Sequence, residues 1–330
     1  MNNFSLISKD KRFWIGIGIS LFFLYLAFQS IEFDKFFKAL KEVNYLFLIP
    51  VTFFSILTYV IRAWRWKYFF KHIKQIRFSS LFSAVMIGFM ANNILPARIG
   101  ELVRAYCIGK KEDVSKSMSF ATIVLERIFD GFSLLFLFGV ILFFCPFPRE
   151  VTRISHIVIG IYLFATVILI AMWIGKKSVI KVVEFLCTKL PSHIGKGIVE
   201  HTHSFISGFD VLKNWQEILL IFFYSLLLWT FSAISFYCMF LGCNIHLPFF
   251  AAVFVLIVIA IGISIPSSPG YIGTFQYFAV LGLAVFGIDK NTALTYSLVI
   301  HISQWIVTIV IGWIYLYRER ISFSDIKKQL

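Results

Sequence analysis

Three ionisable side chains follow Pro96 within an otherwise apolar stretch of the sequence, namely Arg98, Glu101 and Arg104. Their spacing of three residues places them near one face of a helix. Pro96 suits the first turn of that helix, because the N–H group that it lacks would have no partner there. A helix N-terminus offers free N–H groups to an anion, and arginine matches a phosphate with two parallel hydrogen bonds. The pattern therefore predicts a phosphate site at Arg98 and Arg104, with a lipid phosphate as its natural ligand.

A supporting polar network is expected around these two arginines. Asn92 and Asn93 precede the proline, and Glu126, Arg127 and Asp130 lie at the inner end of the next apolar run. Glu126 and Asp130 are four residues apart, so they share a helical face and could pair with the phosphate-binding arginines. Such pairs could hold and release the arginines in turn, or they could form a purely structural network that closes a helix bundle. The sequence leaves both interpretations open.

A second polar interruption, IPSSPGYIGT at 265–274, breaks the apolar stretch 249–287. It is neutral, and its glycines allow close approach of the backbone. His301 and Gln304 are three residues apart in the last apolar run and could face it, although a membrane histidine also commonly serves as a hydrogen bonder between helices. The residues of interest at this break are Pro269, Gly270, Gly273 and Thr274, with Gln276 just beyond; Gly100 is the counterpart of Gly273 at the first break.

The elements that carry these residues must be membrane helices. The chain has 330 residues, of which 59% are hydrophobic and 15% are charged, and this leaves too few polar residues to cover a soluble domain. The net charge of +14 could indicate nucleic-acid binding or Lys and Arg in cytoplasmic loops. The charges fall between apolar runs, which favours the second interpretation. We expect an all-α, polytopic protein of the cell membrane that binds no nucleic acid.

Six apolar runs approach the roughly 20 residues that a spanning helix needs. The first is expected to stay as an anchor, because no A-x-A cleavage site follows it. Two further regions, 81–109 and 249–287, are interrupted. The six runs are 13–30, 45–62, 120–145, 155–174, 218–241 and 293–317.

The distribution of Lys and Arg predicts the orientation of the chain. With the N-terminus inside, 24 of the 31 Lys and Arg residues fall on the inner side and 6 on the outer side, so both termini are predicted to be cytoplasmic. The region 81–109 must then begin and end inside, and 249–287 must begin and end outside. The arms of the first are too short to cross, which favours a re-entrant hairpin; the second could be a hairpin or two tilted spans.

The order of elements repeats with opposite orientation along a single transmembrane domain, 1–330. The pseudo-repeats 1–145 and 155–317 each contain two spans, a broken hairpin and a third span. The breaks are alike, with LPARIGE at 95–101 and SPGYIGT at 268–274. Matching interruptions of this kind in an inverted repeat are typical of the central site of a transporter. The alternative is that both are only tight turns.

Three smaller expectations concern the remaining segments. The cytoplasmic connector 175–217 has apolar positions at helical spacing, which predicts one or two amphipathic surface helices. His193, His201 and His203 lack the partners of a zinc site, so no metal is expected, and the five cysteines, without C-x-x-C spacing, are expected to be buried thiols. An interfacial anchor that prefers anionic lipid is expected at Arg62, Trp64, Arg65, Trp66 and Lys67.

Three motifs in order resemble those of one family, the lysylphosphatidylglycerol synthase transmembrane region, which is also described as flippase-like. NNILPARIGELVR at 92–104 resembles its N-x-x-P-x-R-x-G-E-x-x-R signature, and ERIFD at 126–130 resembles E-R-x-x-D. PGYIGT at 269–274 resembles the P-G-G-x-G-T turn, with Tyr271 where a second glycine is usual. The likeness covers nearly the whole chain.

The resemblance implies an eight-segment bundle linked to the movement of lipid between leaflets. Fuller members of the family carry a soluble C-terminal domain that transfers an aminoacyl group from tRNA to phosphatidylglycerol. Only about a dozen residues follow the last apolar run here, so we expect that domain to be absent and the chain not to be an enzyme.

The leading hypothesis is a flippase-like carrier of an anionic or polyprenyl-phosphate-linked lipid, without a cofactor. The alternatives are a membrane enzyme, or an accessory subunit with partner proteins, in lipid or cell-envelope biosynthesis.

Overall fold

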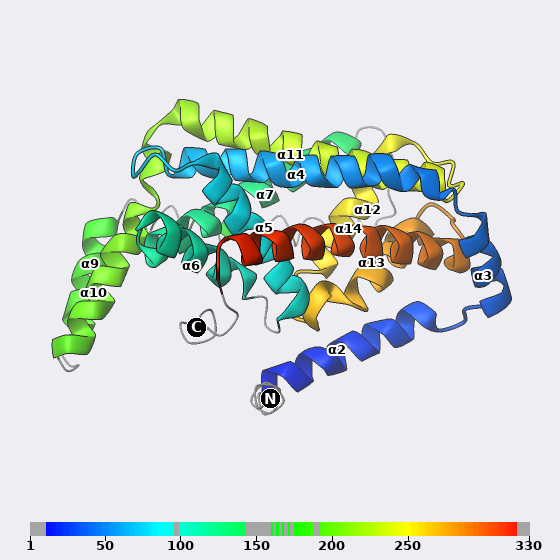
Figure 1. Cartoon of the computed structure of the whole chain (residues 1–330), viewed down its shortest axis with the longest axis horizontal. Helices are drawn as coiled ribbons and strands as arrows, with labels where there is room; N and C mark the ends of the chain where they lie inside the picture. Colours follow the sequence, from blue (N-terminus) through cyan, green and yellow to red (C-terminus); the bar gives the residue numbers. More distant parts are fainter. Residues whose placement is uncertain are drawn as a thin grey trace.

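The chain forms a bundle of α-helices, which confirms the all-α prediction. The computed structural model describes residues 11–95, 99–142, 175–187 and 192–321, with a few residues between 160 and 171. Within those ranges, every regular element is an α-helix or a short 3₁₀ helix, and none is a strand (Figure 1). The long helices run side by side along the longest axis of the molecule, and the two interrupted regions lie among them.

Three helices of the described chain are long and apolar enough to cross a membrane. They are α4 (Leu48–Phe69), which the 3₁₀ helix η1 (Tyr45–Phe47) precedes, α11 (Trp215–Gly242) and α14 (Lys290–Arg318). Helix α7 (Lys116–Leu142) is also long enough, with 27 residues, but three charged residues near its middle make it less apolar than the other three. Each of these helices covers one predicted apolar run, whereas most of the run 155–174 lies outside the described residues.

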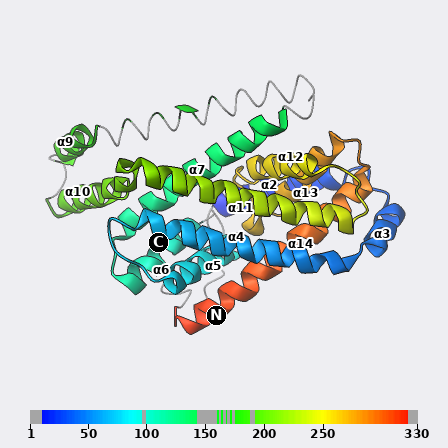
Figure 2. The ribbon, with the colours of Figure 1, turned by 90° about the horizontal axis from the view of Figure 1, so that it is seen from above.

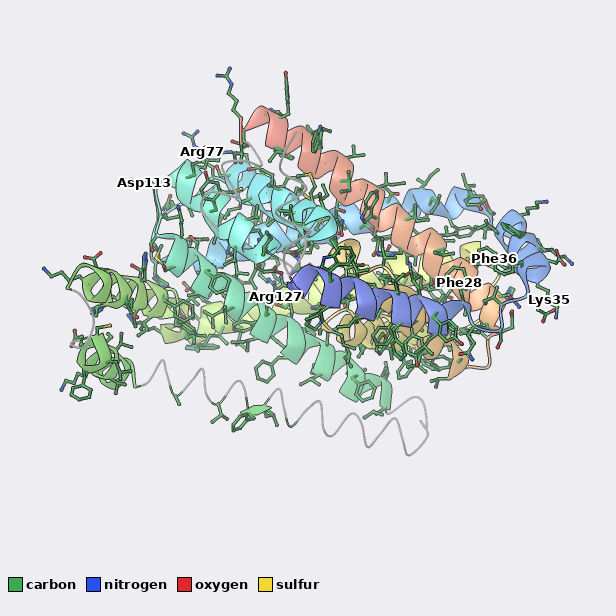
Figure 3. All side chains as sticks on the ribbon, turned by 90° about the horizontal axis from the view of Figure 1, so that it is seen from below. Phe28, Lys35, Phe36, Arg77, Asp113 and Arg127 are labelled. Carbon is green, nitrogen blue, oxygen red and sulfur yellow. The ribbon has the colours of Figure 1, made fainter. Side chains whose placement is uncertain are left out.

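The first apolar run forms α2 (Lys11–Phe28), and a short break separates it from α3 (Phe33–Glu42), which lies at 88° to it. Helix α3 was not predicted, because its three lysines read as an outer loop. It is amphipathic and packs across the start of α14, where the Glu32 N–H donates to Asn291 Oδ1 at 3.1 Å. Figure 3 shows Lys35 and Phe36 of α3 at the opposite end of the molecule from Arg77.

The two interrupted regions each form a pair of short, packed helices. The first consists of α5 (Phe78–Ile94) and α6 (Gly100–Glu112). The second consists of α12 (Phe249–Gly262), the 3₁₀ helix η4 (Pro269–Tyr271) and α13 (Thr274–Ala284). The longest of the four α-helices has 17 residues, or about 26 Å at a rise of ~1.5 Å per residue, less than the ~30 Å hydrocarbon core of a bilayer.

Helices α4 and α11 form the longest seam of the bundle, as both ribbon views show (Figures 1 and 2). They are antiparallel. At one end, Lys71 Nζ, just beyond α4, lies 2.9 Å from Glu217 Oε1 near the start of α11. At the other end, the Asn44 N–H donates to the carbonyl oxygen of Gly242 at 2.8 Å. We call the first of these the basic end, because Lys74, Lys110, Lys111 and Arg318 also lie there on contacting elements.

The predicted amphipathic connector is present as two helices, α9 (Lys176–Cys187) and α10 (Ser192–Ser207), followed by the 3₁₀ helix η3 (Asp210–Lys213). Helix α10 packs against α7, and His201 Nδ1 lies 3.0 Å from Ser117 Oγ. Among the described residues, no three His, Cys, Asp or Glu side chains gather as metal ligands would. Cys107 and Cys243 are buried and Cys187 and Cys238 half-buried, so the expectation of buried thiols holds for two of the four described.

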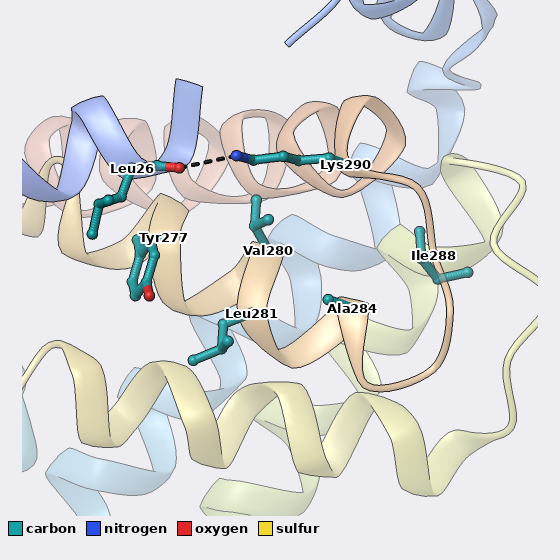
Figure 4. A pocket seen from close by; sticks show the side chains of 7 residues that line it. All are labelled: Leu26, Tyr277, Val280, Leu281, Ala284, Ile288 and Lys290. Carbon is teal, nitrogen blue, oxygen red and sulfur yellow. Dashed lines mark hydrogen bonds between the residues drawn. The ribbon is translucent and has the colours of Figure 1, made fainter. Parts of the chain in front are cut away.

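Lys290, at the start of α14, forms hydrogen bonds with the end of α2. It lies beside an apolar pocket of about 250 Å³ between α2, α13 and α14 (Figure 4). Its ammonium group donates to the carbonyl oxygens of Leu26, at 3.0 Å, and Gln29. Carbonyls at a helix C-terminus have no partner within the helix and carry its partial negative charge, so a cation there satisfies them.

Replacing this lysine tests its role. We expect Lys290→Met to lower the free energy of unfolding by about 0.5–1 kcal/mol, because the α2 carbonyls lose their cation. Thermal unfolding of the detergent-solubilised protein measures the change. Lys38→Met is the matched control, since the Lys38 ammonium is exposed, lies 3.9 Å from the exposed Glu42 carboxylate, and its loss should leave the melting temperature unchanged. Equal effects of the two substitutions would contradict the assignment.

Candidate functional site

Arginines from two helices meet two acidic residues of α7 in the interior of the bundle. Arg62 and Arg65 come from α4, Arg104 from α6, and Glu126 and Asp130 from α7. All five are buried, and none of these residues has more than 5% of its surface exposed. We call these five residues the arginine–carboxylate cluster.

The two carboxylates divide the arginines between them. Asp130 receives Arg62 Nη1 at 3.0 Å and Arg65 Nη1 at 2.6 Å, one on each oxygen. Glu126 receives Arg104 Nη2 at 2.9 Å, and Arg65 Nη2 lies 3.6 Å from it. Arg127 adds a further contact, at 3.5 Å from Asp130, with 41% of its side chain exposed. The cluster thus links α4, α6 and α7.

Aromatic rings enclose the guanidinium groups. The Arg104 guanidinium lies 4.2 Å from the centre of the Trp66 ring, and the Trp66 N–H donates to Thr122 Oγ1 at 2.9 Å. The Arg62 guanidinium lies 5.2 Å from the centre of the Phe89 ring. Cation–π contacts strengthen where water is excluded, so these rings stabilise charge that solvent cannot reach.

The prediction of an interfacial anchor at residues 62–67 is wrong for three of its five members. Arg62, Arg65 and Trp66 are buried, whereas Trp64 and Lys67 are exposed, with the Lys67 ammonium 5.6 Å from the Trp64 ring. The helical period explains the difference, because positions i, i+3 and i+4 share one face and that face meets the carboxylates of α7. The spacing of Arg62, Arg65 and Trp66 was the signal that could have found them.

Positive charge exceeds negative charge in the arginine–carboxylate cluster. Three buried arginines face two buried carboxylates; beside them, half-exposed Arg127 adds a fourth guanidinium and half-buried Glu101 a third carboxylate. Five of the buried guanidinium nitrogens hydrogen-bond to none of the described residues: Arg62 Nε, Arg65 Nε and Nη2, and Arg104 Nε and Nη1. A buried donor costs free energy until it finds an acceptor. The cluster can therefore accept an additional anion.

The expected ion pairs are present in part. Glu126 pairs with Arg104, one of the options given by the sequence. Asp130 instead pairs with Arg62 and Arg65, which were expected in an interfacial anchor. Pro96 and Arg98 lie outside the described residues, so the part of Arg98 in a phosphate site stays a prediction.

At the first break, Asn92 bridges the two short helices. Its Oδ1 accepts from the N–H of Gly100 at 2.8 Å, and its Nδ2 lies 3.4 Å from the Glu101 carboxylate. Asn93 turns the other way and donates to Thr308 Oγ1 of α14 at 2.6 Å. Both asparagines of the predicted network therefore hold the break in place, with Glu101 half-buried beside them.

Gly100 allows the close approach of α5 and α6. A Cβ atom at this position would lie 2.2 Å from the Gly88 carbonyl oxygen and 2.5 Å from Asn92 Oδ1. These distances exclude every other residue type unless the backbone moves. The packing of α6 on α5, and with it the position of Arg104, depends on this glycine.

At the second break, Gln276 has the role that Asn92 has at the first. Its Oε1 accepts from the N–H of Gly273 at 2.8 Å, which leaves its amide N–H₂ to donate to His301 Nδ1 at 2.9 Å. A ring nitrogen that accepts carries no proton, so His301 is the neutral form protonated at Nε2. Its ring stacks on Phe275 at 4.2 Å. His301 thus faces the break, as predicted, and acts there as a hydrogen bonder between helices.

The turn of the second break packs against the first. Gly270 and Gly273 have φ values of +69° and +90°, which glycine adopts without strain. A Cβ atom on Gly270 would lie 3.4 Å from the carbonyl oxygen of Asn93, so η4, which begins at Pro269, lies against the end of α5. Thr274 Oγ1 donates to the Tyr271 carbonyl oxygen at 3.0 Å and closes the turn. The two breaks, far apart in sequence, are therefore in contact.

A cavity of about 160 Å³ lies beside the arginine–carboxylate cluster, between helices of both interrupted regions and α4, α11 and α14. Arg62 and Gln304 are among the residues that line it. Gln304 therefore faces this cavity, whereas His301, one turn earlier on α14, is bound at the break.

These features define a polytopic helical membrane protein with charged residues and chain breaks in its interior. Residues 13–312 match the family described as the lysylphosphatidylglycerol synthase TM region, and the chain belongs to that family. This confirms the resemblance seen in the three sequence motifs.

Curated relatives are similar over much of their length. The UPF0104 membrane protein MJ1595 of Methanocaldococcus jannaschii is 27% identical over 322 residues, which cover 93% of this chain and 94% of the relative. A second protein of that organism, MJ1078, is 23% identical over 68% of this chain and 92% of its own length. Glycosyltransferase AglD of Haloferax volcanii is 24% identical over 135 residues, 40% of this chain and 22% of that protein. No solved structure matches.

Removing one carboxylate tests the energetics of the cluster. We expect Glu126→Gln to destabilise the protein by about 3–5 kcal/mol, because it leaves a buried guanidinium without its charge partner. In the double variant with Arg104→Gln, the loss should be smaller than the sum of the two single losses. Thermal or denaturant unfolding in detergent measures all three, with Glu42→Gln on exposed α3 as the control. Additive losses would show that the two residues do not interact.

A pair of glycines tests the packing of the first break. Gly100→Ala should lower stability by at least about 2 kcal/mol and shift the α5–α6 contact, since the added carbon overlaps backbone. Gly139→Ala in α7 is the matched control, because a Cβ atom there meets nothing within 4 Å. Alanine at this helical position should instead stabilise by about 0.5–1 kcal/mol. Similar melting temperatures for the two variants would contradict the described packing.

Proposed function

We propose that this chain is a flippase-like carrier that moves an anionic or polyprenyl-phosphate-linked lipid between the leaflets of the cell membrane. The observation that carries the proposal is the excess of buried arginines over buried carboxylates in the arginine–carboxylate cluster. Ionisable groups within membrane segments are costly, so a cluster with surplus charge indicates function more strongly than a balanced one.

A phosphate group is the ligand that best suits this surplus. Guanidinium groups bind phosphate through paired N–H donors, and the buried arginines have five nitrogens without a described hydrogen-bond partner. Membrane lipids are the source of phosphate nearest to such a site. The predicted phosphate ligands Arg98 and Arg104 remain part of the proposal, with Glu126 holding Arg104 at 2.9 Å until the lipid arrives.

The arrangement of the breaks suits a carrier of the inverted-repeat type. Each break carries a side-chain amide that accepts from the glycine at the start of the following helix, Asn92 from Gly100 and Gln276 from Gly273, both at 2.8 Å. We propose that both pairs of short helices are re-entrant hairpins and that the two halves rock about their contact. With the basic end facing the cytoplasm, both termini would lie there.

A second candidate is a membrane enzyme or accessory subunit in lipid or cell-envelope biosynthesis. The similarity of 135 residues to part of glycosyltransferase AglD favours keeping it. The similar segment amounts to 22% of AglD, so the likeness concerns only part of that protein. Product formation from purified lipid by the purified chain, or activity that appears only with a co-purified partner, would support this candidate.

Lipid exchange in liposomes tests the carrier function directly. The purified protein is reconstituted with fluorescent phosphatidylglycerol or a short fluorescent polyprenyl phosphate, and a membrane-impermeant quencher reports the fraction in the outer leaflet. We expect quenching beyond the initial outer-leaflet fraction for at least one anionic lipid, and a slower rate for Arg104→Gln. Exposed Arg77→Gln is the control (Figure 3). Exchange at the rate of protein-free vesicles for every anionic and isoprenoid lipid would refute the proposal.

A further inference from the structure

The cavity beside the arginine–carboxylate cluster continues a polar stripe along the α4–α11 seam. Four hydroxyl residues line it in facing pairs, with Ser55 Oγ 3.3 Å from Ser235 Oγ and Thr58 Oγ1 3.5 Å from Ser232 Oγ. Arg62, a member of the arginine–carboxylate cluster, lies one helical turn beyond Thr58 on α4. The seam thus leads from a buried guanidinium through hydroxyl groups toward the end of the molecule opposite the basic end.

Arg62 differs from the other arginines of the cluster because it reaches this cavity. Its side chain is buried and lines the cavity, and its Nε has no hydrogen-bond partner in the described part of the chain. Gln304 of α14 adds an amide to the lining. Among the described residues, no Asp or Glu side chain lines the cavity, and the carboxylate nearest to Arg62 is that of its partner Asp130. An open donor with further polar groups around it suits an anion.

We propose that Arg62 receives a phosphate group in this cavity and that Asp130 is the internal anion that the phosphate replaces. This inference deepens the proposed function, on which it rests, by naming the receiving residue and the group that holds it in the empty state. With the cavity empty, Asp130 keeps Arg62 paired at 3.0 Å, so that its buried charge is compensated.

Asp130 can release Arg62 without losing its own partners. It also receives Arg65 Nη1 at 2.6 Å and the Trp229 N–H at 3.3 Å, and Arg127 lies 3.5 Å away. Exchange of Asp130 for phosphate at Arg62 therefore leaves no charge of the cluster unpaired. A cluster with equal numbers of cations and anions could not make this exchange at so little cost.

The size of the cavity limits which part of a lipid can enter. At about 160 Å³, it has room for a phosphate group and a few attached atoms. A hydrocarbon chain would have to remain outside, in the membrane. The structure therefore assigns the cavity to the phosphate of a lipid headgroup or to free phosphate, and the experiment separates these sources.

Ligand-induced stabilisation of the purified protein in dodecylmaltoside tests the assignment. A ligand that binds only the folded state stabilises it by RT ln(1 + [L]/Kd), so the melting temperature rises with ligand concentration and gives the apparent affinity. The probes are dihexanoyl phosphatidate, inorganic phosphate, and dihexanoylglycerol, which lacks the phosphate. We expect a rise that follows this relation with phosphatidate and none with dihexanoylglycerol. A rise of equal affinity with inorganic phosphate would support the site and assign it to free phosphate.

Variants of the two exchanging groups make the test specific. Arg62→Gln should weaken the apparent affinity for phosphatidate at least tenfold, and the control Arg77→Gln should leave it unchanged. Asp130→Asn should tighten it several-fold, because the internal competitor is gone, even if the unliganded variant melts earlier. If Arg62→Gln does not fold, Ala260→Leu takes its place in the test. It fills part of the cavity without changing charge and should weaken phosphatidate binding.

Three results would overturn the inference. They are an absence of any rise in melting temperature with phosphatidate in the unmodified protein, an Arg62→Gln affinity equal to that of the unmodified protein, and weaker binding in Asp130→Asn. The liposome assay answers the separate question of lipid movement. Binding without leaflet exchange would refute the carrier function and leave the phosphate site intact, whereas exchange that survives Arg62→Gln would refute only the site.

Discussion

The structure depends on the pairing of arginines with Glu126 and Asp130 inside a largely apolar bundle. A single charge in such surroundings costs several kcal/mol, so each arginine must lie where a carboxylate can reach it. Because α7 carries both carboxylates, the helices that supply the arginines, α4 and α6, must pack against α7 at a fixed height and rotation. Helix α11 contacts the same cluster, because Arg65 Nη1 donates to Ser225 Oγ at 2.5 Å and the Trp229 N–H donates to Asp130 at 3.3 Å.

The two chain breaks solve one problem in the same way. A helix that begins inside apolar surroundings exposes N–H groups that water cannot reach. Asn92 and Gln276 each satisfy the first such group, at Gly100 and Gly273, and use the other half of the amide to bind a neighbouring side chain. The matching positions of Pro and Gly in the sequence thus correspond to matching hydrogen bonds. A turn that only reverses the direction of the chain does not need such bonds.

The sequence predicted the helical class and most of the long helices, and it offered as possibilities that His301 faces the second break and that Arg104 pairs with Glu126. These follow from apolar run length and residue spacing, which are local properties. It missed the burial of Arg62 and Arg65, because the flanking Trp64 and Lys67 are exposed and resemble an interfacial belt. It also missed the amphipathic helix α3, because its three lysines were interpreted as part of an outer loop. Which face of a helix meets a partner depends on packing between distant segments, and a single sequence does not record it.

The right angle between α2 and α3 has a consequence for the position of the whole molecule in a bilayer. If α2 crosses the membrane, α3 must lie in the plane of its surface. There, Phe33 and Phe37 are exposed, Phe36 is buried toward the bundle, and the three lysines of the helix can face lipid headgroups. Such a helix is an interfacial anchor. It would fix the depth of the bundle in the bilayer, and so the distance of the buried arginines from the bilayer midplane.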